Sequence, residues 1–389
     1  MHLNIYLRMH KVLVLNQVIG VDIDKKKIKA ISQGILPFLE EGVLALLERN
    51  LNKDFTLGTN DQLSSCDAVF ITVGTLLSDK LLPDHSAVVE VVEDIAPRLK
   101  DGSLIVLRST VEPKTTRKIF KLIKKKTTKD IHLVYAPERI AEGFAVKELY
   151  ELPQIIGSFD DISFDKASEI FSLFVSQVIK TDPLTAELAK LTLNTYRYAR
   201  FALANELMMI ANHHGKDIYD VLKIANKDYI RGGIPSPGFA AGPCLVKDSF
   251  FIRHNTPYND VIYGSYLIND RLPEYIVSEL NKRTKLKNQK IALLGLTFKK
   301  NVDDTRGSLS MKLYDLLEKK SKSVSVHDPY VAKGELKKVL KNADVIIISV
   351  NHDEYTNLTS EGIKHMVGNK VLICDMWNVL GKGQIFFDL

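Results

Sequence analysis

The chain has 389 residues, of which 45% are hydrophobic and 26% are charged, and its formal net charge is +6. These values suit a globular protein of two or three domains and exclude a strongly basic nucleic-acid-binding protein. There is no membrane-spanning apolar run or signal-peptide pattern, and the three cysteines form neither a disulfide framework nor a metal cluster, so we expect a cytoplasmic protein without a metal site.

Short apolar runs alternate with helical patterns up to about residue 160. A lysine-rich helix is predicted from Lys25, and the basic residues between Lys114 and Lys129 recur at the spacing of the solvated face of an amphipathic helix. Strands are predicted at 17–22, 68–73, 104–107 and 132–135. This alternation predicts an α/β fold with a doubly wound, Rossmann-like sheet.

The middle of the chain is helical, and the C-terminal part returns to strands. Asp182 and Pro183 predict the start of a long helix that Gly215 stops, and another helical stretch is predicted over about 260–282. Strands are predicted at 290–295, 323–329, 344–350 and 370–375. We therefore expect a Rossmann-like domain over 1–178, a central helical domain over 179–283 and a second α/β domain over 284–389.

Asp22 ends the first predicted strand. A carboxylate there suits the ribose hydroxyls of an adenine dinucleotide and favours NAD over NADP, although an aspartate after a strand is often a turn residue. A first strand and a G-x-G-x-x-G turn should precede this acid, but Gly20 is the first glycine of the chain. We therefore expect this domain to lack its first strand and glycine loop, as in a chain truncated or altered at its start.

The sequence G-P-C-L-V-K-D at 242–248 follows a turn of small residues. If a helix starts at this turn, Lys247 and Asp248 lie on the same face as Cys244. A thiol near a cation and a helix N-terminus ionises more easily, which makes it a nucleophile. A lone cysteine is more often a small buried hydrophobe, so the other motifs must decide between the two interpretations.

Further motifs follow in a fixed order. They are V-I-G-V-D-I-D at 18–24, G-x-x-P-x-x-E-x-G at 34–42, I-T-V-G-T at 71–75, S-T-V at 109–111, P-E-R at 137–139, A-E-L-A-K and N-T-Y-R within 186–197, C-x-x-K-D at 244–248, and G-L-T-F-K and D-D-T-R within 295–306. Together they resemble the UDP-sugar 6-dehydrogenases, NAD-dependent enzymes that oxidise the sugar C6 alcohol to a carboxylate in two steps. The resemblance runs from about Val18 to the C-terminus.

This resemblance implies covalent catalysis at Cys244, whose thiolate would capture the C6 aldehyde as a thiohemiacetal that a second NAD oxidises to a thioester. Lys190 and Asn194, four residues apart on one helix face, would stabilise the oxyanion at C6. Asp248 would assist proton transfer or orient the attacking water. Without the surrounding motifs, the pair of Lys190 and Asn194 would equally suit a solvated surface.

The resemblance also implies binding residues and a homodimer formed through the central helices. Glu138 would line the sugar site and help hydrolysis, Thr110 would hold a water, and Glu142 is a second candidate that equally suits an exposed loop. The implied cofactor contacts are Asp22, Thr75, Thr110 and Arg306, of which Arg306 could instead reach the nucleotide. The implied substrate contacts are Glu138, Arg139, Glu142, Lys190, Asn194, Lys247, Lys299 as a diphosphate ligand, and Arg231 across the subunit interface.

The segments P-E-R, E-L with L-P-Q-I-I-G at 148–157, and I-x-x-P-G at 234–238 resemble the N-acetylhexosamine branch of the family. UDP-N-acetyl-D-mannosamine is the first expectation, with UDP-N-acetylglucosamine and UDP-glucose as alternatives. The chain departs from the family pattern at Leu76, Ala241, Gly307 and Trp377, where proline, glycine, glutamate and arginine are usual. An active dehydrogenase is one hypothesis, and a non-catalytic UDP-sugar-binding homologue that holds NAD poorly is the other.

Overall fold

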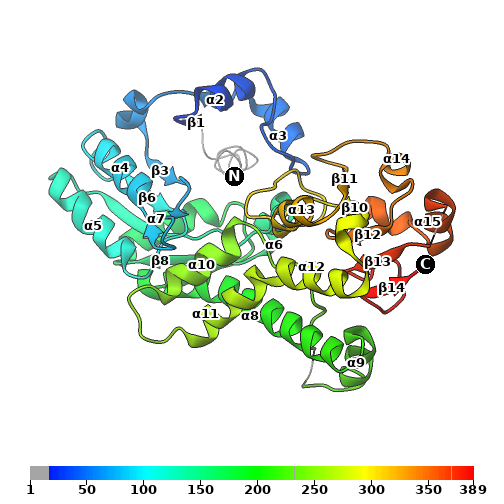
Figure 1. The fold of residues 1–389 in the computed structure, drawn as a ribbon. Coiled ribbons are helices and arrows are strands. Elements are labelled where there is room, and N and C mark those ends of the chain that lie inside the picture. Colours follow the sequence, from blue (N-terminus) through cyan, green and yellow to red (C-terminus); the bar gives the residue numbers. More distant parts are fainter. Residues whose placement is uncertain (1–16, 232, 369) are drawn as a thin grey trace. The chain divides into compact units, whose positions relative to one another are not determined.

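The computed structural model describes residues 17–231, 233–368 and 370–389. The chain divides into two compact units, which Figure 1 shows as ribbons. Unit 1 comprises Met1–Leu193 and Phe250–Asn255, and unit 2 comprises Asn194–Ser249 and Thr256–Leu389. The expected lack of a first strand and a glycine loop concerns residues 1–16 and lies outside the described residues. Within the described part of the chain, every helix is too short or too polar to cross a membrane.

A five-stranded sheet forms the centre of unit 1. Its strands, in spatial order, are β3 (Ala68–Ile71), β6 (Leu104–Leu107), β7 (His132–Tyr135), β8 (Gln154–Ser158) and β9 (Val178–Thr181). The predicted strands at 104–107 and 132–135 are confirmed, and the one predicted at 68–73 ends two residues early. The sheet is mixed because β8 runs antiparallel to β7. Two small sheets accompany it: β1 (Val18–Gly20) with β2 (Phe55–Leu57), and β4 (Leu76–Leu77) with β5 (Pro83–Asp84).

Helices cover both faces of this sheet. Ile105 and Leu107 pack with one set of helices, while Leu104 and Val106 pack with the other, as the alternation of side chains along a strand requires. The first set is α4 (Ser86–Ile95) and α5 (Thr115–Lys126), and the second is α6 (Ala145–Glu151) and α7 (Asp161–Phe171). The predicted doubly wound architecture is confirmed. Unit 1 also contains the helices α2 (Lys25–Ser32), α3 (Val43–Asn50) and η2 (Asn60–Ser65).

The long central helix α8 spans Pro183–His213. The side chain of Asp182 accepts the N–H groups of Leu184 and Thr185 at 2.9 and 3.1 Å, and Gly215 follows the helix with a φ of +66°. The prediction of this helix is therefore confirmed at both ends.

The helical stretch predicted over 260–282 is confirmed, but it consists of two helices. The structure has α11 (Asp260–Asp270) and α12 (Leu272–Arg283), separated at Arg271. Pro273 explains the break, because proline cannot donate an N–H to the preceding turn but fits the first turn of a new helix.

Unit 2 contains the second sheet. Its order is β11 (Ser323–His327), β10 (Lys290–Leu294), β12 (Val345–Ile348), β13 (Leu372–Asp375) and β14 (Phe386–Asp388), and only β14 is antiparallel to its neighbour. The chain leaves β10 to form β11 on one side and then β12 on the other. The carboxyl end of β10 is therefore a switch point, where α/β sheets bind ligands.

The second sheet is also covered on both faces. Ile291 and Leu293 pack with α9 (Ile218–Ala225), α12 and α13 (Leu309–Lys320), whereas Ala292 and Leu294 pack with the opposite layer. That layer contains α14 (Leu336–Leu340) and α15 (Ser360–Val367). The short turns η3 (Leu286–Asn288) and η4 (Asp353–Asn357) complete the unit together with α10 (Pro243–Arg253), which continues into unit 1.

A buried carboxylate links α12 to α8 within unit 2. Burial by itself would raise the pKa of Glu279, but hydrogen bonds from Lys282, Arg283 and Asn212 lower it to about 2. Because this pKa lies below the unfolded value of 4.5, Glu279 stabilises the fold above pH 4.5, and the contribution is lost as the pH falls towards 2. We expect Glu279→Gln to lower the free energy of unfolding at pH 7 by about 1.5–3 kcal/mol.

Urea denaturation at pH 7 and pH 3.5 measures this effect. The control is Glu335→Gln, which changes an exposed carboxylate on the same unit and should alter stability by less than about 0.5 kcal/mol. The difference between wild type and Glu279→Gln should shrink at the lower pH. An equal loss in the two variants at pH 7 would contradict the assignment.

Candidate functional site

Helix α10 places Cys244 in its first turn, as the motif predicts. Gly242 has a φ of +97°, and a Cβ there would lie 2.5 Å from the ring of Phe298, so only glycine fits. Its N–H donates to the carbonyl of Gly307 at 3.2 Å. Cys244 is half-buried at a helix N-terminus, where the helix dipole favours a thiolate. Ala241, a departure from the family pattern, lies in the hydrophobic core of unit 2.

Asp248 lies one helical turn after Cys244 and is only 1% exposed. Its Oδ2 accepts a hydrogen bond from Nδ2 of Asn194 at 2.6 Å, and Nζ of Lys247 lies 3.9 Å from its Oδ1. The structure thus joins two predicted site residues, on α8 and α10, that are 54 positions apart. Lys190 is half-buried on α8, one turn before Asn194.

The buried side-chain amide of Asn205 holds the turn before Cys244 by two hydrogen bonds to Gly238, which we call the amide clamp. The sequence did not lead us to predict it. Asn205 of α8 is fully buried; its Nδ2 donates to the carbonyl of Gly238 at 3.0 Å, and its Oδ1 accepts the N–H of Gly238 at 2.9 Å. The same Nδ2 donates to Oδ1 of Asn269 on α11 at 2.9 Å. The position of Asn205 among apolar residues of a long helix could have indicated a buried polar contact.

We expect Asn205→Ala to disturb the cysteine turn. Losing the clamp leaves the N–H and C=O of Gly238 buried without this partner, which should cost about 1–3 kcal/mol of stability. A shift of the turn should lower the alkylation rate of Cys244 by iodoacetamide about ten- to a hundredfold. The control is Asn212→Ala, another α8 amide, which contacts Tyr275 and Glu279 instead. Similar Cys244 alkylation rates in both variants would contradict a positioning role for Asn205.

In unit 1, hydrogen bonds join the two loops that carry the implied cofactor contacts Thr75 and Thr110. Oγ1 of Thr75 donates to the carbonyl of Thr110 at 2.7 Å, and Oγ of Ser109 donates to the carbonyl of Val73 at 2.7 Å. These loops follow β3 and β6, and Asp22 follows β1, so all three lie at carboxyl ends of parallel strands, where dinucleotides bind. The residues present therefore fit a dinucleotide at these positions.

The carboxylate of Glu138 holds the P-E-R loop by accepting hydrogen bonds from the loop's own backbone. Its Oε1 accepts the N–H groups of Arg139 and Ile140 at 2.7 and 2.8 Å, and its Oε2 binds the guanidinium of the buried Arg108. Arg108 also donates to Oε1 of Gln154 at 3.0 Å. The sequence reasoning missed Arg108, which directly follows the predicted strand at 104–107. Glu138 is thus a half-buried carboxylate with an internal cation for a partner.

The loop after Glu138 is anchored by the G-x-x-P-x-x-E-x-G segment. The buried Glu40 accepts the N–H of Gly143 at 3.0 Å and that of Ala145 at 2.8 Å, which caps the start of α6. Glu142 is half-buried in the same loop. The motif at 34–42 therefore shapes the loop that carries this predicted sugar contact.

In unit 2, Lys299 lies half-buried in the loop after β10, at the switch point. The guanidinium of Arg306 binds the carboxylate of Asp304: its Nε donates at 3.0 Å and its Nη2 at 2.6 Å. Burial would raise the pKa of Asp304, but these hydrogen bonds lower it. Arg231 is exposed, with its guanidinium carbon 5.2 Å from the ring centre of Tyr229.

The predicted site residues therefore fall into two sets, each described within its own unit. Unit 1 holds Asp22, Thr75, Thr110, Glu138, Arg139, Glu142 and Lys190, and unit 2 holds Asn194, Arg231, Cys244, Lys247, Asp248, Lys299 and Arg306.

Comparison with protein families gives matches along most of the chain. Residues 9–175 match the NAD binding domain of the UDP-glucose/GDP-mannose dehydrogenase family, residues 184–265 its central domain and residues 292–382 its UDP binding domain. The chain belongs to this family. The predicted family resemblance, including an NAD-binding domain, is confirmed.

Individual members of the dehydrogenase family support the same assignment. The chain is 35% identical over 380 residues to the UDP-N-acetyl-D-mannosamine dehydrogenase of Methanococcus aeolicus, covering 94% of this chain and 86% of that protein. It is 30% identical to the Pyrococcus horikoshii enzyme of the same name, covering 95% of this chain and 92% of that protein.

Solved structures of family members share the fold. A UDP-N-acetyl-D-mannosamine dehydrogenase structure from Pyrococcus horikoshii has a TM-score of 0.89 at 29% identity, covering 97% of this chain and 93% of that one. The Staphylococcus aureus UDP-N-acetyl-mannosamine dehydrogenase has a TM-score of 0.85 at 30% identity, covering 97% and 92%. The predicted fold class, two Rossmann-like α/β parts joined by a long helix, is therefore that of dehydrogenases in this family.

Proposed function

We propose that the chain is an NAD-dependent UDP-N-acetyl-D-mannosamine 6-dehydrogenase that oxidises the C6 alcohol to a carboxylate. The observation that carries the proposal is the placement of Cys244 at the start of α10, with the buried Asp248 one turn later and held by Asn194. The names of the relatives support the choice of sugar. UDP-N-acetylglucosamine and UDP-glucose are the alternative substrates.

The proposed reaction uses NAD as the hydride acceptor in both oxidation steps, and Asp22, Thr75 and Thr110 would hold it. Between the two oxidations, the Cys244 thiolate adds to the C6 aldehyde carbon, and a C–S bond forms. The amide nitrogen of Asn194 carries two hydrogens, so it can donate to Asp248 and to the C6 oxygen together. Lys190 supplies a positive charge to the same oxygen.

After the second oxidation the sugar is a thioester of Cys244. Water attacks the C6 carbon, the C–S bond breaks and the thiolate leaves with the bonding electrons. Asp248 takes or orients the proton of the water, and Glu138 and Thr110 position the sugar and the water. Arg139, Glu142, Lys247, Lys299 and Arg306 would bind the substrate.

We also propose three functional domains: NAD binding over 1–178, a central domain over 179–283, and UDP-sugar binding over 284–389. The ranges of the three family matches support this division. A homodimer through the central domain is supported by exposed apolar side chains on α8, among them Leu193, Tyr196, Leu203 and Ile210. It would allow Arg231 to reach the substrate of the partner subunit. A monomer by light scattering at assay concentration would exclude the dimer.

The test is NADH formation by the purified chain with NAD and each of the three UDP-sugars. The proposal expects two NADH per sugar and the highest kcat/KM for UDP-N-acetyl-D-mannosamine. A higher value for another sugar would reassign the substrate. Protection by UDP-sugar against thermal unfolding without any NADH would favour the non-catalytic homologue.

A further inference from the structure

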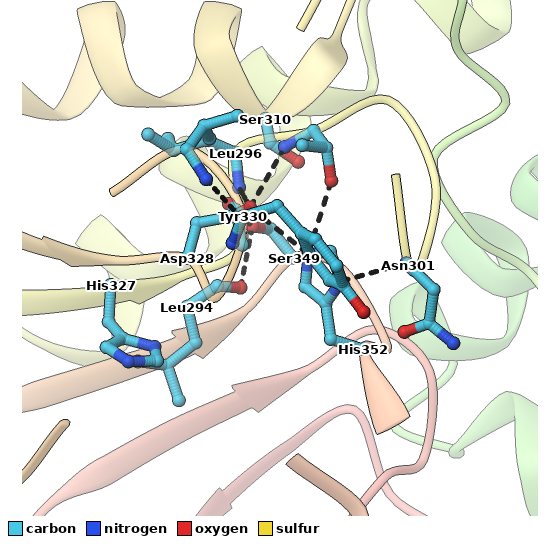
Figure 2. A network of polar contacts seen from close by, with 12 residues as sticks. Leu294, Leu296, Asn301, Ser310, His327, Asp328, Tyr330, Ser349 and His352 are labelled. Carbon is cyan, nitrogen blue, oxygen red and sulfur yellow. Dashed lines mark hydrogen bonds and ion pairs between the residues drawn. The ribbon is translucent and has the colours of Figure 1, made fainter. Parts of the chain in front are cut away.

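The loop over residues 295–301 follows β10 at the switch point of the second sheet and carries Lys299. Figure 2 labels Leu296 and Asn301 of this loop together with Asp328 and His352. Gly295 has a φ of +95°, and a Cβ there would lie 2.5 Å from Cβ of Val350. The loop therefore starts in close contact with the segment that follows β12. Two buried side chains from the neighbouring strand ends then determine its path.

The first of these side chains is Asp328, which follows β11 and is fully buried. Its Oδ2 accepts the N–H groups of Leu296 at 2.7 Å and Thr297 at 3.2 Å, and its Oδ1 accepts the N–H of Tyr330 at 2.9 Å. Burial alone would raise the pKa of Asp328, but these bonds and one from His352 hold it far below its usual value. An ionised carboxylate thus anchors the first half of the loop.

The second is His352, which follows β12 and is also fully buried. Its Nδ1 accepts the N–H of Asn301 at 3.0 Å, and its Nε2 lies 3.1 Å from Oδ2 of Asp328. A ring nitrogen that accepts an N–H carries no hydrogen, so the proton is assigned to Nε2, which donates to Asp328. Figure 2 shows the imidazole between the carboxylate and Asn301. The ring thereby links the two ends of the loop.

Further contacts run along the same loop. Oγ1 of Thr297 lies 3.2 Å from Nε2 of His352 and donates to the carbonyl of Lys299 at 2.9 Å. Nδ2 of Asn301 donates to Asp353 at 2.6 Å, and the N–H of Asp353 donates back to Asn301 at 3.1 Å. The backbone on both sides of Lys299 is therefore held by the segment that begins at His352.

We propose that His352 is a positioning residue for nucleotide binding, which closes the loop over residues 295–301 and so presents Lys299 to the diphosphate of the UDP-sugar. This inference rests on the proposed function. Because Asp328 already accepts the N–H groups of Leu296 and Thr297, these two donors are not available to a phosphate, and the positive charge must come from a side chain. The position of that side chain then depends on the closure of the loop.

Two substitutions of His352 separate its two hydrogen bonds. His352→Asn places an amide oxygen near the position of Nδ1 and can still accept the N–H of Asn301. His352→Gln places an amide near the position of Nε2 and keeps the contact with Asp328 instead. The control is Tyr355→Phe, which removes buried hydrogen bonds to the carbonyl and Nδ1 of His327 and leaves the loop bonds of Asp328 and His352 in place.

The measurement is the affinity of the purified full-length variants for UDP by titration calorimetry, without NAD or turnover. We expect His352→Gln to weaken UDP binding about tenfold or more, and His352→Asn and Tyr355→Phe to stay within about threefold of wild type. In turnover, His352→Gln should raise KM and leave kcat nearly unchanged. Equal UDP affinity of His352→Gln and wild type, or equal weakening by Tyr355→Phe, would overturn the inference.

Double substitutions test whether His352 acts through Lys299. Lys299→Ala should weaken UDP binding, and Lys299→Ala with His352→Asn should bind UDP as Lys299→Ala does. His352→Gln should add little to Lys299→Ala, since it acts through that lysine. Full additivity would contradict the positioning role. Absence of UDP binding by the wild type would instead contradict the proposed function.

Discussion

Replacement of Cys244 by alanine is expected to abolish formation of the UDP-sugar acid. The thiol lies in the first turn of α10, where the helix N-terminus favours its ionised form, and it forms the covalent bond to C6 in the proposed reaction. Loss of a nucleophile that cannot be replaced by water should lower the rate by at least about a thousandfold. Chromatography of the nucleotide sugars and NADH absorbance measure the two products separately.

The matched control for this variant is Cys66→Ala. Cys66 ends the turn η2 and contacts the carbonyl of Gln62, so its replacement should leave the rate near that of wild type. Mass spectrometry of acid-quenched wild type should detect the sugar bound to the peptide with Cys244, and the Cys244→Ala variant should lack this adduct. Formation of the acid by Cys244→Ala at the wild-type rate would exclude covalent catalysis.

Asp248→Asn is expected to fold but to lose most of its activity. The side chain keeps its shape, but the negative charge one turn from Cys244 disappears, and an amide then faces Nδ2 of Asn194, which now donates at 2.6 Å. Removing a group that accepts or orients a proton should lower kcat about a hundred- to ten-thousandfold. The dependence of kcat on pH, measured beside thermal unfolding, distinguishes this loss from misfolding.

The hydrogen-bonded pair of Asn194 and Asp248 can also be tested as a unit. Asn194→Ala and Asp248→Ala should be strongly non-additive in kcat/KM, because each removes the partner of the other. Asp270→Asn is the control, since Asp270 is a half-exposed carboxylate that pairs with Lys312. Additive effects of the two alanine substitutions would show that the hydrogen bond between Asn194 and Asp248 does not serve catalysis.

Much of the local structure was predictable from short stretches of sequence. The ends of α8 follow from Asp182 and Gly215, and α10 begins at the turn before Cys244 as its small residues indicate. The buried strand β6 is a continuous apolar run, and β7 is apolar after His132. The break between α11 and α12 was also readable, because Pro273 marks it, but the helical periodicity on both sides concealed it.

The strand directions and the buried polar pairs were not predictable in this way. β8 runs antiparallel to β7, and this direction depends on the path of the connecting chain. No short stretch of sequence predicts that path. Arg108 with Glu138 and Asn205 with Gly238 join positions 30 and 33 residues apart. A buried polar group must find a partner, but the partner is whichever group the fold brings within reach.

The sequence by itself determined the family, the doubly wound α/β class and the positions of the chemically reactive residues, because periodicity, helix caps and motif spacing depend on near neighbours. Only the tertiary structure decided which of those residues are held and by what. Asn194 reaches Asp248 because α8 and α10 meet. His352 reaches Asp328 because β11 and β12 flank β10 and run parallel to it, so their carboxyl ends lie at one edge of the sheet.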